Sequence, residues 1–584
     1  MLNTNQKLKK LRHIFPKYNI DCYLVSHTDE FQNEFLPNYS KRLQWISNFS
    51  GSAGEIIITK NKAFLFVDGR YTIQSEREVS KKDFSIYNYK DSSLSKILKS
   101  LEGKSIRVGF DSNILTIGKL QKLKKQCGEK IDFIPIERNL IDKLWNDKPK
   151  KPKSKPFLHE KQFSGENSDN KIKQVIKHIK QNNADRYLLT SCDSICWLFN
   201  IRAKDITYSP LFLSKAIIES NGTSIIFSDY QSSPIKQFGQ KVQFKKLTNL
   251  KNYIENKKNI QLKYICHPES ISVQLYELIF KFGKVLFKDE LIQHLKARKN
   301  KTEIKGMKNS HIRDGATLTK FIYWIKKNIS NQKVTELDAI KYLDNERRKN
   351  KNFFSLSFPT IAGSGPNGAI VHYHASKKSN RTIKKDDLLL VDSGAQYFDG
   401  TTDVTRTIAF SCVSEEQKEM YTRVLKGHIA VAQSQIGNKE NGKKLDQVAR
   451  KFLLEVNKNF DHSTGHGVGS FLNVHEGPQS ISAFGTIPFK NGMIVSNEPG
   501  FYKKNQYGIR IENLILAKMN KGKLAFQTIT LAPLEKKLIK ESLLTKGEVR
   551  WINNFHSEVK KKLLPCMNKN QAKWLKEETA RIIH

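Results

Sequence analysis

Four carboxylates and one imidazole in the C-terminal half of the chain are side chains that could hold metal ions. They are Asp392 in LLLVDSGAQ, Asp403 in GTTDVTRT, His466 in HSTGHGVGS, Glu498 in SNEPGFY and Glu512 in GIRIENLIL. This hard, oxygen-rich set suits two divalent ions that share bridging carboxylates. Because such ions make hydroxide from water at neutral pH, the set indicates hydrolysis.

The first two carboxylates lie at the ends of two apolar runs that read as strands. Asp392 ends the run at 388–391 and Asp403 precedes VTRTIAF, with a turn at 398–400 between them. A hairpin of these strands would place the two carboxylates roughly opposite each other. Two unpaired carboxylates at that depth would be costly, and a cation removes the cost. Roles in turns and caps suit Asp399 better than Asp392.

The imidazole lies in a glycine-rich segment, where glycines on both sides let the backbone approach closely. His462 lies four residues before His466, and His475 lies nine residues after it. Three histidines in one short segment indicate a polar site, although either flanking histidine could instead be structural.

The last two carboxylates also lie beside predicted strands. Glu498 precedes Pro499 at a strand end, and alternation in YGIRIENLIL places Arg510 and Glu512 on one strand face. An ordinary Arg–Glu surface pair is the alternative interpretation, and the other candidate ligands make it the weaker one.

The elements that precede these residues read as two copies of one module. Helix-like patterns lead into IDCYLVSHTDE and ADRYLLTSCDS, in which two aspartates are eight residues apart in both copies. Each copy then reaches a tryptophan followed by an apolar residue, at Trp45 and Trp197. Apolar strands that alternate with amphipathic helices predict α/β domains, and duplication is preferred to coincidence.

Two basic runs mark the expected domain boundaries. WNDKPKKPKSKPF predicts an extended connector, and KARKNKTE precedes a long helix for which Thr302 is the predicted N-cap. His311 lies near this helix's apolar stripe, and we expect it to be a packing or capping histidine rather than a metal ligand. A strand-rich region should follow, and then a helical tail with WINNF and WLKEE as apolar anchors. The expected segments are 1–145, 146–157, 158–297, 298–533 and 534–584.

Bulk composition narrows the classes of function. An apolar fraction of 38% can build cores, no run approaches the length of a membrane span, and the N-terminus lacks the apolar stretch of a signal peptide. Seven scattered cysteines argue against a disulfide framework and fit a reducing cytoplasm. The net charge of +43 comes mostly from lysines that are dispersed along the chain, and no nucleic-acid recognition motif accompanies them. We therefore expect neither nucleic-acid nor membrane partners.

Several long motifs follow one another in a fixed order. They are SGSAGEIIIT, FVDGRYTIQSE, CWLFNIRAKDITYSPLF, SFPTIAGSGPNGAIVHYH, VDSGAQYFDGTTDVTRT, HSTGHGVGSFLNVHEGP, NEPGFY and GIRIEN. Together they resemble the aminopeptidase P, or Xaa-Pro aminopeptidase, family of pita-bread metallopeptidases in its cytosolic, three-domain form. The resemblance implies an α/β protein with two creatinase-like domains, an α+β pita-bread catalytic domain, two metal ions, usually manganese, and a homodimer.

The resemblance also implies how the five candidate ligands divide between the two metals. Asp392 would bind one ion, and Asp403 and Glu512 would bridge both. His466 and Glu498 would complete the second ion's set.

Further residues match the family's substrate site. His372 and His475 match substrate-binding and transition-state histidines, and His462 matches a third active-site histidine. Tyr502 and Arg510 match positions on the proline side of the site.

The implied reaction removes the first residue from peptides that have proline second. Glu498 is the expected general base and proton shuttle, and His475 is the expected donor to the developing oxyanion. The chain departs from the family's common HGTGHG at Ser463, which leaves the ligand in place but could change the loop. Two alternatives remain: a prolidase, which acts on Xaa-Pro dipeptides, and a non-catalytic pita-bread protein that binds partners.

Overall fold

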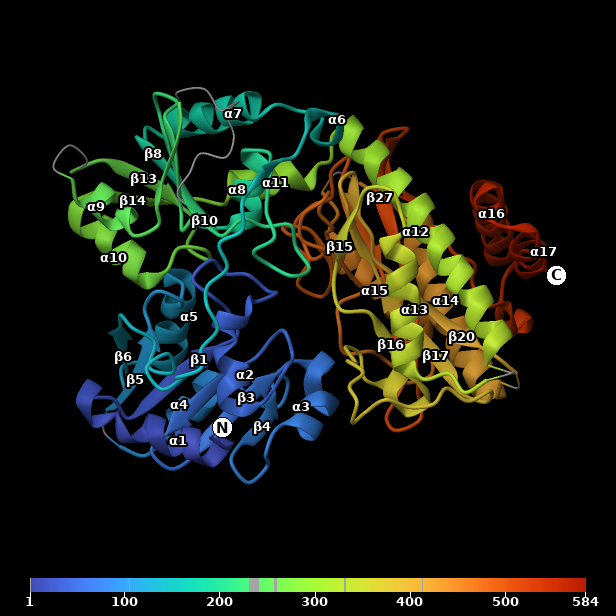
Figure 1. Ribbon diagram of the computed structural model, residues 1–584, viewed down its shortest axis with the longest axis horizontal. Coiled ribbons are helices and arrows are strands. Elements are labelled where there is room, and N and C mark those ends of the chain that lie inside the picture. Colours follow the sequence, from blue (N-terminus) through green and yellow to red (C-terminus); the bar gives the residue numbers. More distant parts are fainter. Residues whose placement is uncertain are drawn as a thin grey trace. The chain divides into compact units, whose positions relative to one another are not determined.

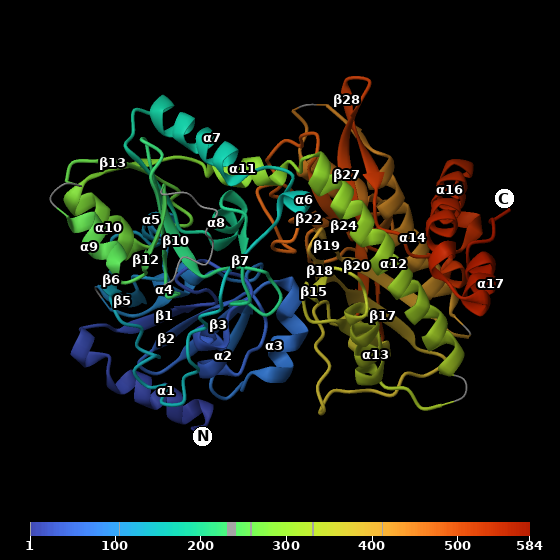
Figure 2. The ribbon, with the colours of Figure 1, turned by 45° about the horizontal axis from the view of Figure 1, so that its top comes forward.

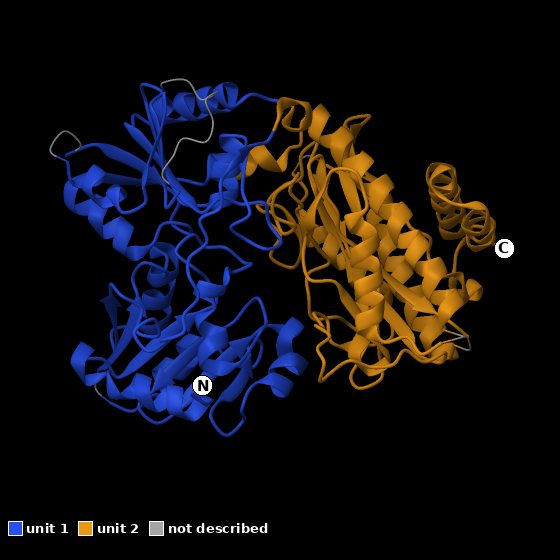
Figure 3. Cartoon of the chain, in the orientation of Figure 1, with its two compact units in different colours: residues 1–159, 166–292 blue, residues 160–165, 293–584 orange. Residues whose placement is uncertain are grey.

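The computed structural model describes residues 2–103, 105–230, 241–256, 260–329, 332–411, 413–437 and 439–583 (Figures 1 and 2). The chain forms two compact units (Figure 3). Unit 1 comprises Met1–His159 and Glu166–Ile292, and unit 2 comprises Glu160–Gly165 and Gln293–His584. No helix in the described ranges is long and apolar enough to cross a membrane.

Unit 1 contains two six-stranded sheets with the same strand order and the same directions of pairing. The first has the order β4-β3-β2-β1-β5-β6, and the second has the order β12-β11-β10-β8-β13-β14. In each sheet the third and fourth strands pair antiparallel, and the last three strands are parallel. The predicted α/β repeat is therefore confirmed. The strands are β1 Cys22–Ser26, β2 Glu55–Thr59, β3 Ala63–Val67, β4 Ser85–Asn88, β5 Ile106–Asp111, β6 Ile131–Ile136, β8 Arg186–Leu189, β10 Ser214–Glu219, β11 Ser224–Ser228, β12 Val242–Lys246, β13 Lys263–Cys266 and β14 Lys284–Phe287.

Residues that the sequence repeat pairs with each other have equivalent roles in the two sheets. Asp21 precedes β1 and accepts a hydrogen bond from the Arg107 backbone (3.0 Å), and Asp185 precedes β8 and accepts one from Lys263 (2.7 Å). Each carboxylate thereby ties the start of one central strand to its parallel neighbour. The helices of unit 1 are α1 Thr4–His13, α2 Arg42–Ser47, α3 Thr72–Glu78, α4 Leu94–Ser100, α5 Ile117–Cys127, α7 Ser168–Gln181, α8 Cys192–Leu198, α9 Asn249–Glu255 and α10 Val273–Phe282.

Unit 2 is built from two layered halves. In the first half, the helices α12 (Lys301–Asn328) and α13 (Glu336–Arg348) share an apolar core with the sheet β16-β17-β20. In the second half, α14 (Glu415–Gln433) and α15 (Gly442–Leu454) share one with the sheet β21-β28-β27-β24. The strands are β16 Ile361–Ser364, β17 Leu388–Ser393, β20 Val404–Ala409, β21 Gln435–Ile436, β24 Ile494–Asn497, β27 Asn513–Asn520 and β28 Lys523–Thr528.

The strand-rich prediction for this region is wrong at α13, α14 and α15. Helix α14 begins at a capping box, in which Ser414 and Gln417 exchange side-chain and backbone hydrogen bonds. Its buried face includes Met420, Val424 and Leu425, at helical spacing. Capping residues and a helical apolar stripe were therefore both present in the sequence.

The predicted hairpin is confirmed, with a shifted register. Strands β17 and β20 pair antiparallel, and Asp392 is opposite Thr405 rather than Asp403. The short strands β18 (Ala395–Tyr397) and β19 (Gly400–Thr401) form the turn between them. Asp403 lies just before β20, so both carboxylates reach the same end of the sheet.

The long helix α12 begins two residues earlier than predicted. Its N-cap is Asn300, whose side chain accepts hydrogen bonds from the backbones of Thr302 and Glu303. The Asn300 backbone N–H in turn donates to the Glu303 carboxylate. The prediction of Thr302 as N-cap was wrong because this reciprocal pair satisfies the helix end first. His311 packs inside the unit, as predicted, with its Nδ1 2.6 Å from the Met307 carbonyl oxygen.

The predicted helical tail is confirmed. Helices α16 (Lys546–Leu563) and α17 (Lys569–Glu578) contain the two tryptophan anchors, Trp551 and Trp574, and both side chains pack on apolar clusters of unit 2. Within the tail, the Leu534 backbone donates to His556 Nε2 on α16 (3.1 Å).

We expect the buried ion pair between α12 and α13 to be essential for the stability of unit 2. Arg347 donates two hydrogen bonds of 2.9 Å to Asp314, which also accepts one from Tyr397 (2.8 Å). Arg347→Met leaves the Asp314 charge buried and should cost about 3–5 kcal/mol in chemical denaturation. The exposed pair of Lys349 and Glu346 supplies the control, since Lys349→Met should cost less than about 1 kcal/mol. Equal losses in the two variants would contradict this role.

Candidate metal centre

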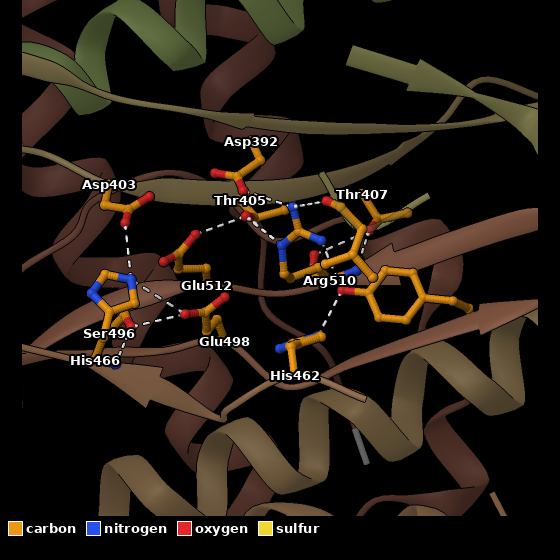
Figure 4. A network of polar contacts seen from close by, with 12 residues as sticks. Asp392, Asp403, Thr405, Thr407, His462, His466, Ser496, Glu498, Arg510 and Glu512 are labelled. Carbon is orange, nitrogen blue, oxygen red and sulfur yellow. Dashed lines mark hydrogen bonds and ion pairs between the residues drawn. The ribbon is translucent and has the colours of Figure 1, made fainter. Parts of the chain in front are cut away.

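The structure brings the five predicted ligands together from five separate segments (Figure 4). Asp392 lies near the end of β17, Asp403 precedes β20, His466 ends β22 (Gly465–His466), Glu498 follows β24, and Glu512 lies between β26 (Tyr507–Arg510) and β27. Both halves of unit 2 therefore contribute ligands. Three of the five side chains are buried, and those of His466 and Glu498 are half-buried.

Three of the five side chains are already close enough to share one ion. Asp403, His466 and Glu512 each offer one ligand atom, and these atoms lie within 4.8 Å of one another. His466 Nε2 is 3.5 Å from Asp403 Oδ2 and 3.4 Å from Glu498 Oε1. The imidazole thus faces two carboxylates through the nitrogen that a metal would use.

One ligand atom has no hydrogen-bond partner. Asp392 Oδ2 accepts a bond of 2.6 Å from Arg510, whereas Asp392 Oδ1 is buried and unpartnered among the described residues. An unsatisfied buried carboxylate oxygen is costly unless a cation or a donor faces it. Together with the oxygen-rich donor set, this atom shows that the residues fit divalent metal ions.

The ionisation of the site shows the same need for positive charge. Burial raises the pKa of Glu498 to about 7 and also raises the pKa values of Asp392 and Glu512. Burial lowers the pKa of the His466 imidazole, but its hydrogen bond to Asp403 and the nearby carboxylate charges outweigh burial and raise that pKa to about 9. The site therefore holds protons near neutral pH where cations would replace them.

Short hydrogen bonds fix the ligand side chains in place. Thr405 Oγ1 donates to Glu512 Oε2 (2.7 Å), and Ser496 Oγ donates to Glu498 Oε1 (3.0 Å). The Ser496 hydroxyl also accepts from the His466 backbone (2.9 Å). The two glutamate side chains and the His466 backbone are thus held by hydroxyls on the neighbouring strands.

A buried arginine and a buried histidine fix the backbone beneath the glutamates. Arg406 donates to the Glu512 carbonyl (2.7 Å) and to the Asn513 side chain (2.8 Å). His428 faces the Asn497 carbonyl through Nδ1 (3.1 Å) and the Asn513 amide through Nε2 (2.9 Å). Sequence reasoning missed both residues. An arginine inside the apolar run VTRTIAF was the available signal for Arg406.

A second chain of hydrogen bonds leads away from the ligands. Arg510 donates to the Tyr502 hydroxyl (2.7 Å), which lies 2.8 Å from His462 Nε2. His462 Nδ1 faces the Ser463 carbonyl (2.8 Å), so Nδ1 carries the proton and Nε2 accepts from Tyr502. The three predicted residues form one network with Asp392. The Ser463 side chain itself is exposed and leaves the His466 position intact.

The two remaining predicted histidines are held on separate loops. The His475 and His466 rings lie edge to face with their centroids 4.3 Å apart. The segment before His372 is anchored to the site, because Arg510 donates to the Val371 carbonyl (3.3 Å). Sequence reasoning missed Glu336, a buried carboxylate that accepts hydrogen bonds from the loops on both sides of His372. These donors are Ser364, Asn367, Tyr373 and Arg381.

Four family models match successive parts of the chain. Creatinase/prolidase N-terminal domains match residues 7–144 and 147–303. Metallopeptidase family M24 matches residues 305–518, and the C-terminal region of peptidase M24 matches residues 522–582.

Named relatives are similar over the full length of the chain. A probable Xaa-Pro aminopeptidase P of Coprinopsis cinerea is 36% identical, covering 100% of this chain and 99% of the relative. Xaa-Pro aminopeptidase 1 of Dictyostelium discoideum is 36% identical, covering 98% and 96%. The crystal structure of X-prolyl aminopeptidase from Caenorhabditis elegans, described as a cytosolic enzyme with a di-nuclear active site, has a TM-score of 0.94 at 30% identity and covers 100% of both chains.

We expect divalent-cation binding to strengthen as the pH rises from about 6 to about 8, because the ligands with raised pKa values must first lose protons. Calorimetric titration of metal-free protein with MnCl₂, in buffers of different ionisation enthalpy, measures the affinity and the protons released. Asp403→Asn should lower the number of ions bound, whereas the exposed-site variant Glu541→Gln should not. Binding that is independent of pH, or unaffected by Asp403→Asn, would contradict the site.

Proposed function

This chain belongs to the aminopeptidase P branch of metallopeptidase family M24, and we propose that it is an Xaa-Pro aminopeptidase. The enzyme removes the N-terminal residue from peptides whose second residue is proline. The observation that carries the proposal is the convergence of all five candidate ligands at one site, in a chain that matches named aminopeptidases from end to end.

The enzyme uses two divalent metal ions, and we propose that they are Mn²⁺. Asp392, Asp403, His466, Glu498 and Glu512 would hold them. When bound, the ions polarise the scissile carbonyl and acidify the attacking water. The di-nuclear active site named for the Caenorhabditis elegans enzyme, together with the fit of the donor set, supports the binding of two ions by these residues.

Glu498 is the residue that moves the proton. Its Oε1 lies 3.4 Å from His466 Nε2, among the residues that would hold the attacking water, and a carboxylate in that position can act as a general base. It takes a proton from the attacking water and passes it to the leaving nitrogen. His475, which packs against His466, donates a hydrogen bond to the oxygen of the tetrahedral intermediate.

The hydrogen-bonded group of His462, Tyr502 and Arg510 forms the wall for the proline residue, and His372 completes the substrate site. An Xaa-Pro bond is a tertiary amide without an N–H, so the wall has to hold the ring by its shape. The mutual hydrogen bonds of these side chains hold that shape in advance. The free amine of the substrate lies against the carboxylates, which restricts cleavage to the first peptide bond.

Several further assignments follow from the resemblance. We propose domains at 1–145, 158–297 and 298–533, a connector at 146–157, and an extension at 534–584. The matched family ranges 7–144, 147–303, 305–518 and 522–582 support three domains and a C-terminal region, although the second range includes most of the proposed connector and the last begins before residue 534. We also propose a homodimer in the cytoplasm that acts on peptides and binds neither nucleic acid nor membrane.

Substrate length and the second residue provide the direct test of this function. Arg-Pro-Pro should be cleaved. Arg-Ala-Pro should be cleaved much more slowly, because the alanine side chain leaves part of the space beside the proline wall empty. The missing methylenes alone give about 1–3 kcal/mol, and the remaining discrimination comes from positioning of the amide. Comparable rates on both tripeptides would identify a general aminopeptidase. Activity confined to Arg-Pro would identify a prolidase, and no activity with Mn²⁺ bound would identify a non-catalytic protein.

Glu498→Gln tests the proton-transfer role. The amide keeps the size of the side chain but cannot accept the proton, so turnover should fall by at least about 100-fold. Stopped-time assays with Arg-Pro-Pro, together with metal analysis of the same samples, separate lost chemistry from lost metal. The matched variant Glu541→Gln should retain full turnover. Unchanged turnover in metal-loaded Glu498→Gln would assign the proton transfer to another residue.

A further inference from the structure

A buried triad of charges lies in unit 2, outside the set of ligands. Lys299 Nζ is 2.6 Å from Glu476 Oε1, and Lys296 Nζ is 3.1 Å from Glu476 Oε2. The two lysine side chains are 1% exposed and the glutamate side chain is 0% exposed. At this depth both lysine charges depend on the Glu476 carboxylate to offset the cost of their burial.

The two lysines lie in a basic run that, from the sequence alone, looks like an exposed boundary between domains. Lys296 lies in α11 (Leu291–Ala297), and Lys299 lies just before the Asn300 cap of α12. The backbone of this run is fixed as well, because Lys299 N donates to the Gly492 carbonyl (2.9 Å) and Arg298 bridges to Met493. The run is therefore a rigid part of unit 2 next to the start of β24.

Glu476 links this run to the histidine loop. It follows His475 directly, and its backbone N–H donates to the Gly467 carbonyl (2.7 Å), one residue after His466. The fit is close, because a Cβ on Gly467 would come within 2.0 Å of the Glu476 carbonyl oxygen. The Glu476 backbone thus joins the two histidine segments, while its side chain is held by the lysines.

We propose that Lys296 and Lys299 are positioning residues that act through Glu476 to hold His475 against His466. The inference rests on the proposed function, since it assigns the support of the histidine that donates to the oxyanion. Both lysines pair with Glu476, which is not one of the five candidate metal ligands. With one carboxylate between two ammonium groups, loss of one lysine leaves a balanced pair, whereas loss of Glu476 leaves two buried cations. The lysine variants are therefore the informative ones.

The test is a double-mutant cycle between Lys299→Met and His475→Ala. On Arg-Pro-Pro, Lys299→Met should lower kcat about tenfold with KM changed less than about twofold, because the misplaced donor acts in the transition state. In the His475→Ala background the same substitution should have almost no further effect on kcat, because the two residues act as one unit. Lys299→Arg, which keeps the charge, should recover most of the lost rate.

Lys326→Met is the matched control. Lys326 pairs with Glu535 at 2.8 Å, and its side chain is 14% exposed in the same unit. This variant should lower the melting temperature and leave kcat unchanged. If Lys299→Met does not fold, Lys296→Met replaces it in the cycle, since it keeps the shorter of the two ion pairs.

The possible outcomes separate the two proposals. Losses in kcat that simply add in the double variant, or a lysine variant with normal kcat, would overturn the positioning role while the function stands. Wild-type protein that does not cleave Arg-Pro-Pro would overturn the proposed function and this inference with it.

Discussion

The catalytic unit has to hold several buried carboxylates close together although their negative charges repel one another. Asp392, Asp403, Glu498 and Glu512 are gathered around one imidazole, and burial raises the pKa values of three of them. Such a cluster is stable only with protons or cations among the oxygens. The rest of the unit keeps the oxygens converging on that space. This convergence depends on the hydroxyls of Thr405 and Ser496, on the buried Arg406 and on the two layered halves of the unit.

Residues with a strong local signal were predictable from the sequence. Asp392 follows an apolar run that can only be a buried strand, so a carboxylate there needs a special explanation. The repeat in unit 1 was visible in the sequence because Asp21 and Asp185 precede equivalent strands. In the structure each accepts a backbone hydrogen bond from the neighbouring parallel strand. The long motifs then connected the ligands to a known family, and the full-length relatives confirm the family.

Residues whose role depends on a distant partner were not predictable in this way. The role of Arg406 depends on the Glu512 carbonyl, which comes 106 residues later, and the role of His428 depends on Asn497 and Asn513, which lie on two different strands. Lys296 and Lys299 looked solvated because Glu476, the carboxylate that pairs with both of them, is far along the chain. Helices α14 and α15 were overlooked for another reason. Their capping residues and apolar stripes were present, but the glycine-rich turns around them favoured a reading as strands.

The reach of Arg406 has a consequence for how the protein is made. Its guanidinium also donates to the carbonyls of Ala532 and Pro533, which follow every ligand in the sequence. A ribosome therefore releases all five ligands before it releases the backbone that fixes them. Contacts of such long sequence separation form late in folding. The carboxylates are therefore fixed in their final places only after Ala532 and Pro533 have been synthesised.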